Sequence, residues 1–323
     1  MKRIRPVKFI LVLFLCLGGL IVLNSLIGPV RIPISEIFSE RYSDILKLRF
    51  FRIMLAIAAG GGLSLAGVIL QGILRNPLSE PYTLGVSSGS GLGAVIGLLF
   101  FSHVVAASML AFIAGLFTIV LVYNLAKLNN RLSTENMIIS GILVSALFSS
   151  LLMFFVSSSS STKIHSVLWW LLGNLQVYRS LDVIIVAVVV FTGVLVGIIF
   201  SKELNALSLG EEEALHLGID IEKVKRILLL VATLVTSIVV SMCGIIGFVG
   251  LMMPHLARRI VGPDHKVLIV SSVLTGAVFL LLCDTFSRTV MAPQELPVGV
   301  ITAFVGVPFF IYILRKTKRT YFR

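Results

Sequence analysis

Long apolar segments alternate with short polar ones along almost the whole chain. A segment of about 20 apolar residues is long enough for an α-helix to cross the hydrocarbon core of a bilayer. The pattern predicts ten membrane-spanning helices, near residues 8–28, 53–74, 83–101, 104–126, 136–156, 182–201, 226–243, 245–260, 267–287 and 297–314. The segment 226–260 is a single apolar run, which we divide at Gly244 and Gly247. We therefore expect an all-α polytopic membrane protein with one transmembrane domain over residues 1–323.

Composition leads to the same class of protein. Hydrophobic residues make up 57% of the 323 positions and charged residues only 13%, whereas soluble domains carry about 25% charged residues. This excludes a soluble enzyme, a disordered chain and a disulfide-rich secreted module. Cys16, Cys243 and Cys283 each lie inside an apolar run without CxxC spacing, as expected of small apolar residues. We expect no metal site and no cofactor.

The basic residues indicate how the chain is oriented. Lys and Arg total 27 against 15 Asp and Glu, a net charge of +12, and they lie mainly between the apolar segments. With ten spans and both termini inside, the inner segments hold more than twice as many basic residues as the outer ones, as the positive-inside rule requires. We therefore expect both termini to be cytoplasmic, and basic loops that face anionic lipid rather than nucleic acid.

Few ionisable residues lie near the predicted membrane midplane. Gln71 and Asn124 are polar but neutral. The ionisable residues lie towards span ends: Glu135, Asp182, His255 and Asp284. A proton-coupled carrier would be expected to keep an acid or a histidine near the midplane. The chain also lacks a Gly-x4-Gly-Lys-Ser/Thr phosphate-binding loop. If the protein transports, its energy should come from a cytoplasmic partner; a stand-alone secondary carrier and a non-transport membrane scaffold remain alternatives.

The predicted inner loop 203–223 is the segment best suited to such a partner. Glu211, Glu212 and Glu213 begin a short helical pattern and complement the positive end of a helix dipole, while Gly218 supplies a stop. The apolar positions between them are Ala214, Leu215 and Leu217. A short amphipathic helix of this kind fits a groove on another protein. The alternative is a helix that lies on the lipid surface.

Small residues recur every four positions in the third predicted span, at Gly89, Gly93 and Gly97. In lipid, such rows let helix backbones approach closely. The same stretch fits a loose dinucleotide-binding pattern, but no strand precedes it, so we interpret it as a helix-packing surface.

Several sequence blocks resemble one known family. They are LRFFR at 48–52, GGGLSLAGVILQGILRNPLSEPYTLGVSSGSGLGAVIG at 60–97, LSTENMIISGI at 132–142, the segment 209–218, GIIGFVGLMMPHLARRIVGPDH at 244–265 and ELPVGVITAFVGVPFFIYIL at 295–314. Together they resemble the FecCD family of ABC importer permeases, in the order in which that family has them. The resemblance implies a permease fold of ten helices, two permease subunits, two ATPase subunits and an extracytoplasmic substrate-binding protein.

The resemblance also implies roles for particular residues. Positions 210–218 resemble the coupling helix that contacts the ATPase, with Gly210, Glu211, Glu212, Glu213, Ala214, Leu215 and Gly218 as its candidate residues. The candidate docking site for the substrate-binding protein consists of Arg49, Arg52 and Arg288. A cytoplasmic gate would consist of Asn76, Leu78, Ser133 and Thr134. Arginine forms planar paired bonds with carboxylates, although it also anchors helices at the headgroups, and Asn-Pro is also a common turn.

The expected function is that of a permease subunit without covalent chemistry of its own. The resemblance favours a ferric siderophore as cargo, with cobalamin or haem as alternatives within the family. It implies a multi-pass protein of the bacterial cell membrane, surrounded by lipid, that pairs with an identical or a paralogous permease subunit.

Overall fold

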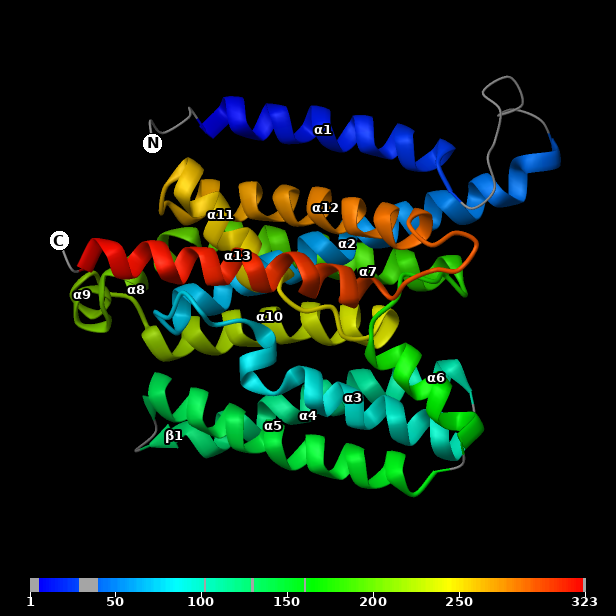
Figure 1. Cartoon of the computed structure of the whole chain (residues 1–323). Helices are drawn as coiled ribbons and strands as arrows, with labels where there is room; N and C mark the ends of the chain where they lie inside the picture. Colours follow the sequence, from blue (N-terminus) through cyan, green and yellow to red (C-terminus); the bar gives the residue numbers. More distant parts are fainter. Residues whose placement is uncertain (1–5, 29–39, 102, 129–130, 160, 322–323) are drawn as a thin grey trace.

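The computed structural model describes residues 6–28, 40–101, 103–128, 131–159 and 161–321, and its long helices lie side by side (Figure 1). The elements in chain order are α1 (Pro6–Leu26), η2 (Glu40–Tyr42), α2 (Ser43–Ile73), η3 (Pro81–Leu84), α3 (Val86–Ile96), η4 (Gly97–Phe101), α4 (Val104–Ala126), β1 (Lys127–Leu128), β2 (Arg131–Leu132), α5 (Thr134–Ser157), α6 (Ser161–Leu171), α7 (Ser180–Ile199), α8 (Ser201–Leu209), α9 (Glu211–His216), α10 (Ile221–Cys243), α11 (Val249–Val261), α12 (His265–Thr289) and α13 (Val298–Tyr321).

Seven helices in the described residues are long and apolar enough to cross a membrane: α1, α2, α4, α5, α7, α10 and α12. The other three predicted spans coincide with shorter helices. Residues 83–101 form α3 and the π-helical turn η4, residues 245–260 form most of α11, and residues 297–314 form the apolar part of α13. An all-helical membrane protein is thus the observed class, and the count of ten crossings stays a prediction.

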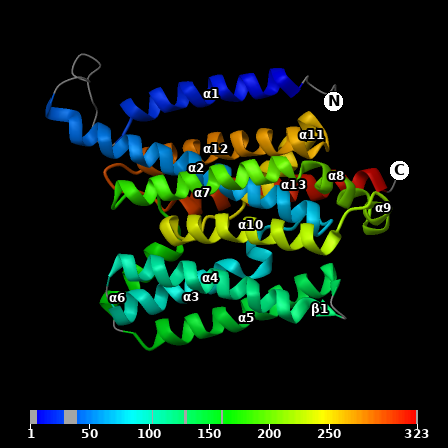
Figure 2. The ribbon, with the colours of Figure 1, turned by 180° about the vertical axis from the view of Figure 1, so that it is seen from behind.

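Helix α2 lies at the centre of the bundle. In its most apolar 18-residue window 89% of the residues are buried, compared with 17% in α1 and 22% in α5. Helices α12, α10, α7 and α11 pack around α2, while α1 and α5 lie at opposite edges of the molecule (Figures 1 and 2). The small residues that make up much of α2 between Ala56 and Gly67 allow this close packing, because short side chains let helix backbones approach.

The bundle has two distinct ends (Figures 1 and 2). At the first, called here the α9 end, α1 begins and α13 ends, and α8, α9 and the β1–β2 hairpin lie there. The opposite end, called here the α6 end, carries α6, the beginning of α2 and the end of α12. The described chain therefore starts and ends at the same end of the bundle; residues 1–5 and 322–323 lie outside the described residues.

The apolar run 226–260 does not form one continuous helix. It breaks at Gly244, the first of the two glycines at which the sequence analysis divides it. Helix α10 ends at Cys243, and Gly244 follows with φ of 68°, a left-handed conformation that glycine adopts without strain. The chain then crosses to α11 over five residues, and Phe248 also has a positive φ of 69°. Helices α10 and α11 are therefore separate elements.

The loop predicted over residues 203–223 is mostly helical. Helix α8 continues from α7 after a single residue, and the six-residue α9 follows it after Gly210. The three glutamates form the first turn of α9, and Gly218 has φ of 77°, which ends the helical segment. The short helix and its stop thus lie where the charge pattern indicates.

The three glycines of the third predicted span face α4. A Cβ atom at Gly89 would overlap Thr118, one at Gly93 would overlap the backbone of Leu110, and one at Gly97 would overlap the backbone of Ala107. These glycines lie at the contact where α3 and η4 pack on α4.

Candidate functional site

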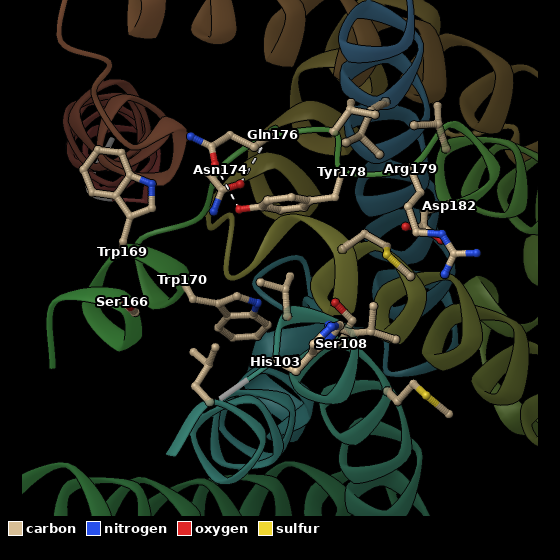
Figure 3. Close-up of a pocket in the computed structure, with 18 of the residues that line it drawn as sticks. His103, Ser108, Ser166, Trp169, Trp170, Asn174, Gln176, Tyr178, Arg179 and Asp182 are labelled. Carbon is tan, nitrogen blue, oxygen red and sulfur yellow. Dashed lines mark hydrogen bonds between the residues drawn. The ribbon is translucent and has the colours of Figure 1, made fainter. Parts of the chain in front are cut away.

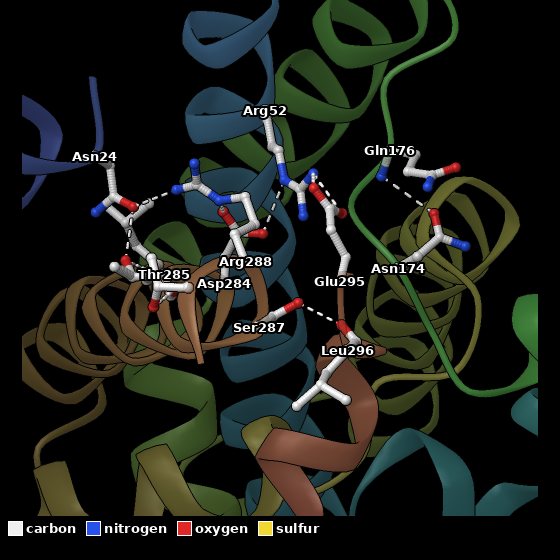
Figure 4. A network of polar contacts seen from close by, with 12 residues as sticks. Asn24, Arg52, Asn174, Gln176, Asp284, Thr285, Ser287, Arg288, Glu295 and Leu296 are labelled. Atoms are coloured by element: carbon white, nitrogen blue, oxygen red, sulfur yellow. Dashed lines mark hydrogen bonds and ion pairs between the residues drawn. The ribbon is translucent and has the colours of Figure 1, made fainter. Parts of the chain in front are cut away.

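A buried carboxylate joins two arginines at the α6 end (Figure 4). Asp284 on α12 is fully buried and accepts hydrogen bonds through both of its oxygens. Arg52 Nε donates to Asp284 Oδ1 at 2.9 Å, and Arg288 Nε donates to Asp284 Oδ2 at 2.9 Å. Hydrogen bonds between charged groups are stronger than those between neutral groups, and they offset the desolvation cost of burying the carboxylate.

Both arginines have further partners. Arg52 Nη1 also donates to Glu295 Oε2 at 2.9 Å; Glu295 belongs to the segment between α12 and α13. Arg288 Nη2 donates to Asn24 Oδ1 of α1 at 2.6 Å, and Thr285 donates to the same oxygen. One polar network therefore holds α1, α2, α12 and the segment before α13 together at this end (Figure 4).

The three candidate docking arginines differ in accessibility. Arg49 is buried and donates from Nη1 to the carbonyl oxygens of Ser25 and Leu26, at 2.8 and 3.1 Å. Arg288 is buried within the network, with its side chain 4% exposed. The Arg52 side chain is 15% exposed, and the Glu295 side chain paired with it is 26% exposed. The most open part of the arginine cluster is thus an ion pair between Arg52 and Glu295.

A cavity of about 1060 Å³ lies at the α6 end of the bundle (Figure 3). Its wall comes from the start of α4, from α6 and from the segment leading into α7, and Leu55 of α2 lies one helical turn from Arg52. Asn174 and Gln176 line the cavity, and the Gln176 backbone N–H donates to Asn174 Oδ1 at 3.1 Å (Figure 4). The lining combines aromatic side chains with mixed charges, among them His103, Lys163, Trp169, Trp170, Tyr178, Arg179 and Asp182. Among the residues that the structure describes, no group of three or more His, Cys, Asp or Glu is placed to hold a metal ion.

At the opposite end, α9 presents one apolar face to the outside. Ala214 is fully buried, whereas Leu215 is 59% exposed and Leu217 is 67% exposed. The Glu213 carboxylate lies over Gly210, in the space that a Cβ atom at Gly210 would occupy. Two leucines at the end of a short helix are thus largely exposed, which is typical of a contact surface for another protein.

The candidate gate residues lie at the α9 end on two different elements. Asn76 Oδ1 accepts a hydrogen bond from the Leu78 backbone N–H at 2.9 Å, and Leu78 itself is 50% exposed. Ser133 caps α5, because its Oγ accepts from the Asn136 backbone N–H, and Thr134 is the first residue of that helix. In the described chain, no hydrogen bond joins the 76–78 turn to the start of α5.

An ion pair at the α9 end was not identified by the sequence analysis, which considered the basic residues of the inner segments only as a group. Lys225 lies on α10 with its side chain only 2% exposed, and its Nζ lies 2.7 Å from Glu211 Oε1. Lys225 also donates to the carbonyl oxygen of Leu132 at 3.4 Å. The signal in the sequence was its place next to Val224, on the apolar side of the first turns of α10, where a lysine needs a buried partner.

Comparison with known proteins matches nearly the whole chain to one family. A model of the FecCD transport family matches residues 11–316. The cobalamin import system permease protein BtuC of Halobacterium salinarum is 42% identical over 84% of this chain and 73% of its own length. The Fe(3+) dicitrate transport system permease protein FecD of Escherichia coli is 33% identical over 96% of this chain and all of its own.

A solved structure agrees with this placement. It is that of a metal-chelate type ABC transporter in an inward-facing conformation, with a TM-score of 0.86 and 30% identity, and the match covers 96% of this chain and 99% of the other. The similar sequences are thus permease proteins of ABC transporters, which leave ATP hydrolysis to separate subunits. The fold, the relatives and the apolar helices agree, and the chain belongs to the FecCD transport family.

Proposed function

We propose that this chain moves a ferric siderophore through the cell membrane as the permease subunit of an ATP-driven importer. The main support for this proposal is that each end of the helical bundle has a surface suited to contact with another protein. A short helix exposes Leu215 and Leu217 at one end, and an arginine network with an open ion pair lies at the other. An importer of this class needs a partner at each end.

In the proposed arrangement the α9 end is cytoplasmic and both termini lie there. The two shorter apolar helices, α3 with η4 and the first part of α13, complete ten crossings together with α11 and the seven long helices. The predominance of Lys and Arg on the predicted inner segments supports this orientation. Reporter fusions within residues 203–223 and after Thr289 test it: the first should report the cytoplasm and the second the outside.

Energy enters through α9 in this mechanism. Binding and hydrolysis of ATP in partner subunits move α9, and the helices that border the transport path tilt in response, which opens it to alternate sides. Asn76, Leu78, Ser133 and Thr134 form the cytoplasmic constriction, since short polar and apolar side chains can close a path without binding the cargo strongly. A second permease subunit, identical or paralogous, completes the path.

The α6 end receives an extracytoplasmic substrate-binding protein. Arg52 is the arginine best placed for this contact, because its guanidinium is partly exposed and already paired with a carboxylate of the segment before α13. Acidic side chains on the docking protein have the same chemistry as Glu295, so they can compete for Arg52. Arg49 and Arg288 are buried and stabilise this end of the bundle, Arg49 through its bond to the Ser25 carbonyl and Arg288 through its bond to Asp284.

Cobalamin is the second candidate cargo, favoured by the 42% identity to a cobalamin import permease. The decisive experiment reconstitutes the chain with its ATPase subunits and binding protein in proteoliposomes, and compares uptake of a radiolabelled ferric chelate with uptake of cobalamin. We expect ferric chelate to accumulate only with ATP inside. Uptake that follows a proton gradient without ATP would contradict the proposal, and accumulation of cobalamin alone would reassign the cargo.

A further inference from the structure

Two side chains of α10 hold the segment that leads into α5. The Leu132 backbone N–H donates to Glu222 Oε1 at 3.1 Å, and the Leu132 carbonyl oxygen accepts from Lys225 Nζ at 3.4 Å. Glu222 and Lys225 are three residues apart, so they lie on the same face of the helix. Leu132 is itself buried, and α5 begins two residues after it. The start of α5 is therefore attached to α10 through both polar groups of one residue.

The same lysine is attached to α9. Lys225 is almost completely buried, and its strong contact is the 2.7 Å ion pair with Glu211, the first residue of α9. If Glu211 moved away alone, it would leave a buried ammonium group with only the longer bond to the Leu132 carbonyl. A buried charge that loses its partner is strongly destabilised, so α9 and Lys225 have to move together.

We infer that Lys225 is a positioning residue that transmits the displacement of α9, through Leu132, to the start of α5. The inference rests on the proposed function, since it takes α9 as the ATPase contact and Ser133 and Thr134 as part of the gate. It adds the connection between them. The hairpin β1–β2 ends at Leu132, so a shift of its backbone moves the residue that caps α5. In the part of the chain that the structure describes, no hydrogen bond or ion pair of the Lys223 or Arg226 side chain bridges two elements, whereas Lys225 contacts both α9 and the hairpin.

A transport experiment separates this role from a purely structural one. Lys225→Met keeps the length and apolar stem of the side chain but removes the ammonium group, and a matched control, Arg226→Met, removes an exposed charge from the next position. We expect Lys225→Met to bind the ATPase and hydrolyse ATP, but to move about tenfold less cargo per ATP, as coupling between distant sites typically amounts to 5–150-fold. Arg226→Met should match the wild type, and Lys225→Arg should recover most of the ratio.

A second experiment needs no partner protein. Hydrogen–deuterium exchange is measured on the full chain in nanodiscs, with the wild type compared with Glu211→Ala, which changes a side chain of α9 and removes the carboxylate partner of Lys225. We expect amides in residues 131–137 to exchange faster in this variant, although in the described residues no hydrogen bond joins Glu211 to them directly. Unchanged exchange there, or an unchanged ratio of cargo to ATP in Lys225→Met, would overturn the inference. Absence of ATP-dependent uptake by the wild type would instead contradict the proposed function and leave the exchange result valid.

Discussion

Asp284 and Arg52 are 232 residues apart in the chain, yet they form a 2.9 Å ion pair in which the carboxylate is fully buried. The same carboxylate also binds Arg288, one helical turn further along α12. A single acidic group thus accepts hydrogen bonds from two arginines, one of which, Arg52, also pairs with Glu295. It connects α2 to the last turns of α12. This explains how two basic side chains can lie within the packed end of a membrane protein.

Substitution of Asp284 by Asn should destabilise the folded chain. The variant leaves two guanidinium groups without their shared counter-charge, which costs about 3–5 kcal/mol where such pairs are buried. The measurement is the denaturation midpoint in detergent. Asp44→Asn is the matched control, because Asp44 is an exposed acid in the first turn of α2 and should contribute no more than about 1 kcal/mol. Equal midpoints for the two variants would show that the network does not stabilise the fold.

The proposed docking role of Arg52 predicts a loss of partner binding. Arg52→Ala should weaken binding of the substrate-binding protein by about tenfold, and more at low salt than at high salt, because the contact is an ion pair near the surface. Arg179→Ala removes an exposed arginine from the same end of the bundle and serves as the control. Binding is measured by surface plasmon resonance on nanodiscs. Identical affinities for wild type and Arg52→Ala would remove Arg52 from the docking surface.

The exposed leucine on α9 predicts how the ATPase is held. Leu215→Asp replaces an apolar side chain that is 59% exposed in the isolated chain. If Leu215 is buried in a groove of the ATPase, its loss costs about 2 kcal/mol, which is roughly thirtyfold in affinity. The ATPase should then fail to co-purify with Leu215→Asp, while Leu215→Met should retain it. Co-purification with the Asp variant would favour a stand-alone carrier.

The burial of Glu80 predicts that the stability of the folded chain depends on pH. It lies in the turn between α2 and η3, outside the spans, and burial raises its pKa from 4.5 to about 7. The folded chain therefore binds a proton between these values that the unfolded chain does not, so stability decreases as pH rises from 4.5 to 7 and levels off above. Glu80→Gln should flatten the pH dependence of the denaturation midpoint over this range, whereas Glu135→Gln, which changes an exposed glutamate in the first turn of α5, should not. A wild-type midpoint that rises between these pH values would contradict the prediction.

The local features of the fold were predictable from the sequence, because they depend on neighbouring residues. Apolar length identified the long helices, Gly244 marked the break before α11, and three glutamates followed by Gly218 marked α9. Each of these signals acts within a few turns of chain. The local sequence pattern was therefore enough to predict the class of protein and the position of the short helix α9.

The partners of the charged side chains were not predictable in this way. The sequence analysis noted Asp284 only as an acid near the end of a span and interpreted the arginines as open to a partner. Whether an arginine is free depends on which distant helices lie beside it, and here α1, α2 and α12 supply partners across more than 200 residues. Lys225 was missed for the same reason, since its carboxylate comes from α9 and its carbonyl from the hairpin before α5.

The contact between α2 and α12 gives the last prediction. A Cβ atom at Gly60 would overlap the carbonyl of Gly276 and lie 2.8 Å from Leu280 Cβ, and one at Gly276 would overlap the carbonyl of Gly60. The obstacle is backbone on both sides, so the helices would have to separate, and Gly60→Ala should cost about 1–3 kcal/mol. Gly18→Ala on α1 is the control, because nothing lies within 4 Å of its added Cβ and alanine favours the helix. Thermal unfolding in detergent should therefore show a lower midpoint for Gly60→Ala and an equal or higher one for Gly18→Ala. If Gly60→Ala unfolded at the wild-type temperature, α2 and α12 would have to be less closely packed in the membrane than in this structure.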